Sequence, residues 1–193
     1  MTAARPWACG AEPERPDGAA RPWACGAERE RPDGVAAASL ERAAWDVLRS
    51  VEDPELPIAI TDLGLVRDVH VDAGGRVSVR LVPTWTACPA LVVIRGRVRE
   101  GLLAIPGVRD VSVEYTYDEP WTLERMTSRG REQLAAHGLD VPACRFAEPP
   151  VCPYCGSHDV AMDSLFGPTL CRSTYVCRQC RNPFERFKPP AEP

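Results

Sequence analysis

The residues with the clearest chemical meaning are four cysteines near the C-terminus, arranged as two Cys-x-x-Cys pairs with twenty-one residues between them. They are Cys152, Cys155, Cys177 and Cys180. Each pair can place two thiolates on one tight turn, so two such turns brought together can hold a metal ion tetrahedrally. Pro153 and Gly156 favour a turn in the first pair, and the β-favouring residues 174–176 predict a strand leading into the second. The spacing therefore predicts a zinc ribbon or a rubredoxin-like iron site.

The main alternative for these four cysteines is two disulfide bonds. Disulfides need an oxidising compartment, and the N-terminus lacks the charged start and apolar core that direct export. We therefore expect a cytoplasmic protein with a metal site. Four thiolates suit zinc and iron alike, so the sequence does not separate the two metals. We expect a structural zinc, with iron as the alternative.

A fifth cysteine of this region, Cys171, lies six residues before Cys177. It could replace one of the four ligands, pack as a small buried apolar side chain, or be a free reactive thiol. Burial is the commonest fate of a lone cysteine, and we expect it here.

Cys88 has a different context, between a predicted strand and a predicted helix. Proline is favoured at the first position of a helix, so Pro89 places Cys88 at the N-cap. Unpaired N–H groups and the positive end of the helix dipole would stabilise a thiolate there. Cys88 is therefore a candidate nucleophile or metal ligand, and the alternative is a cysteine that only packs beneath the sheet.

The segment 51–66 carries four acidic residues and two prolines between a helix and a strand. Asp53, Glu55 and Asp62 could bind a metal near Cys88. They could also cap backbone N–H groups, which is the commoner use of an aspartate in a loop. Both interpretations stay open at this point.

Hydrophobic periodicity predicts the elements that position these residues. A helix capped by Ser39 ends at Asp53-Pro54, strands over 65–71 and 76–82 flank a turn, and a helix follows Pro89. A third strand over 108–117 and a helix over 127–137 complete the order α-β-β-α-β-α. This order predicts an α+β fold, in which helices pack on a small mixed sheet.

A tandem repeat occupies the N-terminus, where residues 4–18 recur as 20–34 with a single difference. The unit is rich in proline, glycine and charge, so it cannot bury enough apolar surface to offset its ordering entropy. We expect a disordered tail over 1–38, an α+β domain over 39–147 and a zinc ribbon over 148–193.

Composition excludes some functions for the 193-residue chain. No stretch approaches the roughly twenty apolar residues of a membrane span, so we expect no membrane partner. The net charge is −4, and residues 151–193 hold five Lys and Arg against four Asp and Glu. This balance argues against nucleic acid as a partner, because binding phosphates needs a basic face.

Several motifs together resemble a known family. The first part of the chain resembles SufT-like iron–sulfur assembly domains in three motifs. These are DPELPIAITDLGLV at 53–66, PTWTACPA at 83–90, and Pro120-Trp121-Thr122 with Met126. Fusion of that domain to CPYCGS, LFGPTLC and YVCRQCRNPFERFK resembles the PaaD family, also called PaaJ. The resemblance covers residues 39–190. Trp85 stands where the family pattern has tyrosine, and the repeated N-terminus is foreign to the family.

The resemblance implies an accessory subunit of the ring-1,2-phenylacetyl-CoA epoxidase system, which acts in aerobic phenylacetate degradation. The implied role is maturation, assisting iron–sulfur cluster assembly in the flavin-containing reductase, with the oxygenase and reductase as partners. We do not expect catalysis by this chain alone, because it lacks the Glu and Glu-x-x-His helices of a di-iron oxygenase. Homodimer formation is left open.

The resemblance also implies that Cys88 is the central thiol, which transiently holds iron or a cluster, with Asp53, Glu55 and Asp62 around it. One alternative is a rubredoxin-like electron-transfer component. Another is a thioester hydrolase using Cys88, but that interpretation lacks a recognisable base.

Overall fold

The computed structural model describes residues 34–142 and 149–188. Most of the predicted tail, residues 1–33, lies outside the described residues. Helix α1 (Gly34–Ser50) includes residues 34–38, so Ser39 lies inside this helix and its prediction as the N-cap is wrong. The alanines at 36–38 have high helix propensity and allow the helix to begin earlier.

A three-stranded sheet forms the centre of the first part of the chain. Its strands are β1 (Val66–Val71), β2 (Arg76–Leu81) and β3 (Asp110–Tyr115), in the order β1-β2-β3. Strand β2 is antiparallel to β1 and parallel to β3, which confirms the predicted mixed sheet. At the β1–β2 turn, the Asp72 carboxylate accepts the N–H groups of Gly74 and Arg76 at 2.8 and 2.9 Å.

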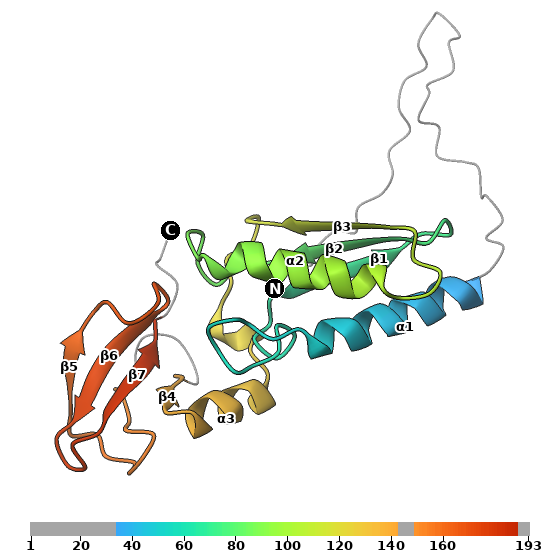
Figure 1. The fold of residues 1–193 in the computed structure, drawn as a ribbon. Helices are drawn as coiled ribbons and strands as arrows, with labels where there is room; N and C mark the ends of the chain where they lie inside the picture. Colours follow the sequence, from blue (N-terminus) through green and yellow to red (C-terminus); the bar gives the residue numbers. More distant parts are fainter. Residues whose placement is uncertain (1–33, 143–148, 189–193) are drawn as a thin grey trace, which may run out of the picture. The chain divides into compact units, whose positions relative to one another are not determined.

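Two helices lie side by side on one face of this sheet (Figure 1). Helix α2 (Ala90–Leu103) turns a stripe of buried residues toward the sheet. The stripe consists of Ala90, Ile94, Val98 and Leu102. Its spacing of four residues follows the helical repeat, so one face is apolar along the whole length. Helix α1 packs on β1, α2 packs on β3, and the two helices contact each other.

A third helix, α3 (Ser128–Ala136), follows a short 3-10 turn at Leu123–Arg125 and agrees with the helix predicted over 127–137. Thr127 caps it, since its hydroxyl oxygen accepts the N–H of Gly130 at 3.0 Å. None of the helices in the described residues is long and apolar enough to span a membrane.

The cysteine-rich part of the chain forms a second, four-stranded sheet in the order β4-β7-β6-β5. Strands β5 (Val160–Ser164), β6 (Arg172–Cys177) and β7 (Pro183–Phe187) are antiparallel neighbours. Strand β4 (Leu139–Asp140) comes from the segment after α3 and pairs in parallel with β7. The sequence did not predict β4, which adds a strand from outside the cysteine-rich segment to the ribbon sheet.

The buried apolar residues in the described part of the ribbon fall into two separate clusters. The ribbon's own small core contains Cys152, Tyr175, Cys177 and Phe184. In contrast, Cys171 and Phe187 belong to the larger core cluster, where the Phe187 ring lies 5.4 Å from that of Trp121. The predicted boundary between residues 147 and 148 falls in the segment 143–148, outside the described residues, and stays a prediction.

Candidate metal and cluster-assembly sites

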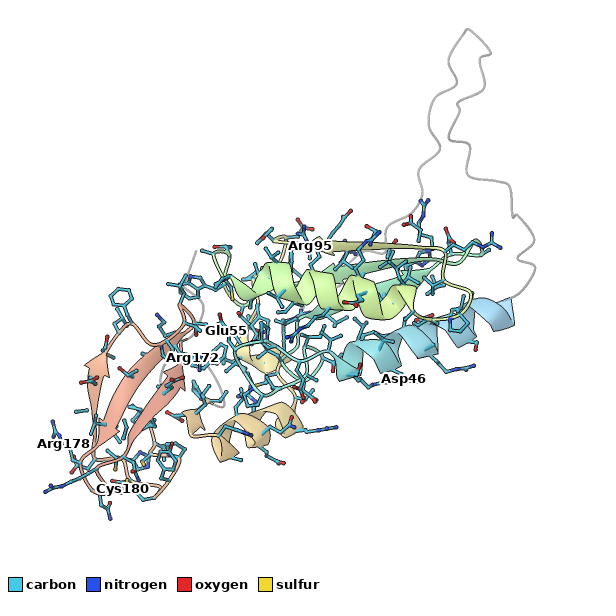
Figure 2. The ribbon with its side chains drawn as sticks, viewed as in Figure 1. Asp46, Glu55, Arg95, Arg172, Arg178 and Cys180 are labelled. Carbon is cyan, nitrogen blue, oxygen red and sulfur yellow. The ribbon has the colours of Figure 1, made fainter. Side chains whose placement is uncertain are left out.

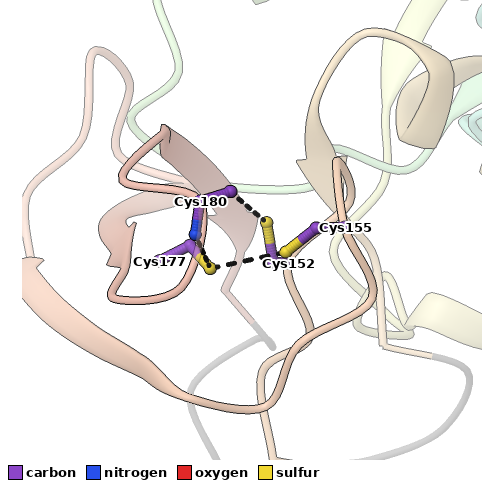
Figure 3. Close-up of side chains that lie close together, drawn as sticks. All are labelled: Cys152, Cys155, Cys177 and Cys180. Atoms are coloured by element: carbon purple, nitrogen blue, oxygen red, sulfur yellow. Dashed lines mark hydrogen bonds between the residues drawn. The ribbon is translucent and has the colours of Figure 1, made fainter.

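The four ribbon cysteines converge as their spacing predicts. Their sulfur atoms all lie within 4.8 Å of one another, and the Cys152–Cys180 and Cys155–Cys177 pairs are each 3.6 Å apart (Figure 3). A tetrahedron with Zn–S bonds of about 2.3 Å has S···S edges of about 3.8 Å, so a single metal ion fits this cluster. The six cysteines of the described residues are all free, so no disulfide competes there for these sulfurs.

Two tight turns place the sulfurs. In the first, the N–H of Cys152 donates to Ser157 O, and Gly156 returns a hydrogen bond to Cys152 O, both at 2.9 Å. In the second, Cys177 N–H donates to Asn182 O at 3.0 Å, and Arg181 adopts a left-handed φ of 61°. Each turn therefore fixes one Cys-x-x-Cys pair through its own backbone.

Hydrogen bonds to sulfur favour the metal-binding thiolate in the second turn. The N–H of Cys180 donates to Cys177 Sγ at 3.5 Å, and this bond is the main cause that lowers the pKa of Cys177 to about 7. The side-chain amide of Asn182 donates to Cys180 Sγ at 3.6 Å. Because thiolate, not thiol, ligates a metal, these groups support the four-sulfur site as outer partners.

Cys88 lies at the end of a turn that leads into α2. Its N–H donates to Trp85 O at 3.2 Å, and its carbonyl accepts the N–H of Leu91 at 3.3 Å. The N-cap of α2 is Pro89, with φ −65° and ψ −24°. Cys88 was predicted to be this N-cap and lies one residue before it. The side chain is half-buried, packed against the larger core.

The pKa of the Cys88 thiol is raised, so the predicted stabilisation of a free thiolate is wrong. Burial is the largest cause, and the charges of Glu55, Cys171 and Asp53 act in the same direction. A hydrogen bond from the N–H of Ala90 opposes them but does not prevail. A cation that shares the site would therefore favour negative charge on the sulfur at neutral pH.

Asp53 caps backbone N–H groups, which is one of the two uses considered for it, whereas metal binding near Cys88 stays a prediction. Its carboxylate accepts the N–H groups of Glu55 and Leu56 at 2.8 and 3.0 Å, which caps the loop after α1. Its charge also acts on Cys88, and burial raises the pKa of Asp53 itself. Glu55 follows in the same loop and lines a pocket with Arg172 of β6 (Figure 2).

Asp62 makes its contacts elsewhere, at the start of α3. Its carboxylate accepts the Thr127 hydroxyl at 2.8 Å, and its backbone carbonyl accepts the Thr127 N–H at 2.9 Å. Arg129 lies 3.7 Å away. The charges of Asp53 and Glu55 thus act on Cys88, whereas Asp62 makes a contact that holds α3. A direct role for Asp62 at Cys88 stays a prediction.

Cys171 is buried, as expected, but its place was not foreseen. Only 6% of the residue is exposed, and Thr169 Oγ1 lies 3.1 Å from its sulfur. Strand β6 separates Cys171 from Cys177 by six residues, or roughly 20 Å of extended chain. It therefore cannot replace a ribbon ligand. Sequence reasoning missed its burial in the larger core, because the contacts there join residues far apart in the chain and no local pattern links them.

A pocket of about 340 Å³ lies beside the Cys88 turn. Its lining includes Trp85 and Thr86 of that turn, together with Tyr117, Glu119 and Trp121. The motifs PTWTACPA and Pro120-Trp121-Thr122, which are distant in sequence, therefore meet around one cleft.

Comparisons with known proteins give two family matches. The family described as iron–sulfur cluster assembly protein matches residues 41–115, and the PaaD zinc beta ribbon domain matches residues 143–188. The cysteines Cys152, Cys155, Cys177 and Cys180 thus form the metal-binding cluster of a zinc ribbon.

Three curated relatives resemble different lengths of the chain. The Escherichia coli K12 protein named as one subunit of a "Putative 1,2-phenylacetyl-CoA epoxidase" is 39% identical over 75% of this chain and 90% of its own length. The Fe-S protein maturation auxiliary factor YitW of Bacillus subtilis is 34% identical over 46% of this chain and 87% of its own. The Fe-S protein maturation auxiliary factor SufT of Staphylococcus aureus is 39% identical over 40% of this chain and 88% of its own.

Proposed function

Because this chain belongs to the PaaD family of phenylacetyl-CoA epoxidase subunits, we propose that it is an accessory maturation factor of that epoxidase system. It assists assembly of the iron–sulfur cluster in the reductase component, and it is not the oxygenase. Its partners are the oxygenase and the flavin-containing reductase, and it acts in the cytoplasm without binding nucleic acid or membrane.

The observation that carries this proposal is the place of Cys88 in a family whose relatives are named as maturation factors. The thiol is half-buried at the start of α2, with Asp53 and Glu55 acting on it and a pocket beside its turn. The groups that shift the pKa of Cys88 include carboxylates and no histidine. Such a thiol suits cation binding better than nucleophilic catalysis.

The electrostatics of this site indicate how cargo is held and released. With no cation present, burial, together with the nearby negative charge, raises the pKa of Cys88 and favours its protonated form. An iron ion or cluster supplies the compensating positive charge, and the Cys88 proton leaves to solvent as the sulfur binds. Few protein ligands surround the cargo compared with the four sulfurs of the ribbon, which favours transfer to a recipient.

The ribbon has a structural role in this proposal. Its four sulfurs complete a tetrahedron and leave no open position for substrate, as in structural zinc sites. The rubredoxin-like alternative, with iron in the same four sulfurs, uses the same geometry. A purified protein that is red and bleaches on reduction would favour iron and electron transfer, whereas zinc gives a colourless ribbon.

The proposal is tested by producing the reductase in cells with wild-type protein, with Cys88→Ser or with no accessory protein. We expect Cys88→Ser to lower the iron and sulfide content of the purified reductase as far as omission does, while its own zinc content and fold are retained. Ala87→Ser, an exposed change in the same turn outside the pocket lining, is the matched control and should behave as wild type. An unchanged reductase cluster with Cys88→Ser would refute the role of this thiol.

A further inference from the structure

Lys188 is the only lysine of the 193-residue chain, in which 23 residues are lysine or arginine. It directly follows β7, and its backbone N–H donates to the carbonyl of Cys171 at 2.7 Å. Cys171 immediately precedes β6, and the neighbouring residues Arg172 and Phe187 are paired across β6 and β7. The backbone of Lys188 is therefore anchored in the ribbon sheet.

The side chain of Lys188 places its ammonium between two aromatic rings. The nitrogen lies 5.5 Å from the centre of the Trp85 ring and 5.6 Å from that of Phe166, and both distances are within the range of a cation–π contact. It also donates to the carbonyl of Leu165 at 3.2 Å. Leu165 and Phe166 belong to the ribbon loop between β5 and β6, whereas Trp85 belongs to the turn before α2. One ammonium group thus joins the ribbon to that turn.

Hydrogen bonds within the ribbon loop hold Phe166 in place. The Ser164 hydroxyl accepts the N–H of Phe166 and donates to the Phe166 carbonyl, both at 3.0 Å. The N–H of Gly167 then donates to the carbonyl of Arg172 at 2.9 Å. A Cβ on Gly167 would lie 2.9 Å from the same oxygen, so the two backbones approach closely. The ribbon side of the Lys188 contact is therefore fixed by its own backbone.

The other side of the contact belongs to the turn that carries Cys88. The carbonyl of Trp85 accepts the N–H of Cys88 at 3.2 Å, and the Cys88 side chain is half-buried. Trp85 also lines the pocket of about 340 Å³, together with Tyr117 and Trp121. A movement of Trp85 would therefore change both the exposure of the thiol and one wall of the pocket.

From these contacts we propose that Lys188 is a positioning residue for Cys88, which holds Trp85 against the ribbon loop and so keeps the Cys88 turn in its half-buried conformation. The inference deepens the proposed function, and its importance for cargo rests on that function. Zinc then supports the cargo site without binding cargo, because it folds the ribbon that presents Lys188. A positive charge is required at residue 188, since an apolar side chain of similar length cannot make the cation–π contacts.

The positioning role is tested by hydroxyl-radical footprinting of the zinc-loaded full chain, because the rate of modification reports exposure at Trp85 and Cys88 without requiring a thiolate. Lys188→Met removes the charge and should raise both rates by about two- to fivefold, the factor that corresponds to one exposed cation–π contact. Lys188→Arg keeps a cation that stacks on aromatic rings and should stay near wild type. Unchanged rates in Lys188→Met would overturn the proposal.

Arg178→Met is the matched control, because it also removes one positive charge from the ribbon. Arg178 is exposed and pairs with Asp159 at 3.6 Å, so its loss should leave the rates at Trp85 and Cys88 as in wild type. A faster rate in Arg178→Met equal to that in Lys188→Met would show a general effect of charge and contradict the proposal. Zinc content and the thermal unfolding midpoint verify that each variant is folded.

A double-mutant cycle tests whether Lys188 acts through Trp85. Trp85→Leu removes the ring and should itself raise the modification rate of Cys88. If the two residues act together, Lys188→Met should add nothing to Trp85→Leu. Full additivity of the two changes would show that Lys188 does not act through the ring, and would refute the positioning role.

Iron and sulfide content of the reductase, measured in cells that produce each variant, separates this inference from the proposed function. We expect Lys188→Met to lower the content and Lys188→Arg to retain it. If Cys88→Ser lowers the content but Lys188→Met behaves as wild type in both assays, Lys188 only packs, and the proposed function stands. If Lys188→Met exposes Cys88 but Cys88→Ser leaves the reductase cluster unchanged, the contact stands and the proposed function is refuted.

Discussion

The guanidinium of Arg186 on β7 forms an ion pair with the carboxylate of Asp140 on β4, and both side chains are nearly buried, with 10% and 13% exposed. The same carboxylate accepts the N–H of Val151 at 3.2 Å, at the start of the cysteine-rich segment. Asp140 therefore ties β4 to the ribbon through a charge, a backbone hydrogen bond and strand pairing.

Asp140→Ala should destabilise the protein by about 2–4 kcal/mol, because it removes one half of a nearly buried ion pair and the acceptor of the Val151 N–H. Urea unfolding followed by circular dichroism measures this free energy. Asp68→Ala removes an exposed pair with Arg80 and should cost less than about 1 kcal/mol. Equal losses in the two variants would contradict a special role for the buried pair.

Removal of the ribbon metal should unfold β5 to β7 and also disturb the larger core, because Phe187 packs on Trp121 there. Structural zinc in small modules contributes roughly 10 kcal/mol or more to folding. Cys152→Ser or Cys180→Ser should therefore lose zinc and hydrogen-exchange protection in the ribbon, together with a change in tryptophan fluorescence. Cys171→Ser should keep its zinc, since this residue lies outside the four-sulfur site. Zinc loss in Cys171→Ser would contradict that separation.

The alkylation rate of Cys88 should depend on the acidic loop. Its pKa is raised, so at neutral pH the reactive thiolate is scarcer than in an ordinary cysteine, and the rate should rise at higher pH than usual. Asp53→Asn and Glu55→Gln remove negative charge and should lower the pKa, giving faster alkylation near pH 8. Mass mapping of iodoacetamide adducts over pH 6–10 measures this. Asp62→Asn should leave the rate unchanged, and slower alkylation in Asp53→Asn would contradict the electrostatic account.

Alanine substitutions at two glycines are expected to change the stability of the protein in opposite directions. Gly64 has φ +74°, and a Cβ there would lie 2.3 Å from the Arg125 carbonyl oxygen. Gly64→Ala should destabilise the fold by more than about 2 kcal/mol through backbone strain and this clash. Gly96 lies in α2 with open space around it, so Gly96→Ala should stabilise by about 0.5–1 kcal/mol. Thermal unfolding of both variants tests the contrast, and a stabilised Gly64→Ala would refute the close approach.

Local patterns predicted those parts of the structure that depend on neighbours in sequence. Spacing within short segments was enough to predict the Cys152 and Cys177 turns, the β1–β2 hairpin and the helix that follows Pro89. The two residues of β4 carry no pattern of their own, since their pairing with β7 is long-range. For the same reason the burial of Cys171 in the larger core could not be read from the chain.

The Cys88 site shows the same limit in its electrostatics. Its place before a helix was correctly recognised to within one residue, but the direction of its pKa was not. The helix terminus is a local feature, whereas the burial and the charges of Asp53 and Cys171 arise from packing. At Cys88 the effect of desolvation on the pKa is larger than that of the helix terminus.

The most direct test of the central claim is cluster transfer with purified components. The full-length protein is loaded anaerobically with iron and sulfide and mixed with reductase lacking its cluster, and electron paramagnetic resonance of the dithionite-reduced reductase measures the cluster formed. We expect the wild type to restore the reductase signal and Cys88→Ser to leave it near the level given by free iron and sulfide. Equal restoration by wild type and Cys88→Ser would contradict the account.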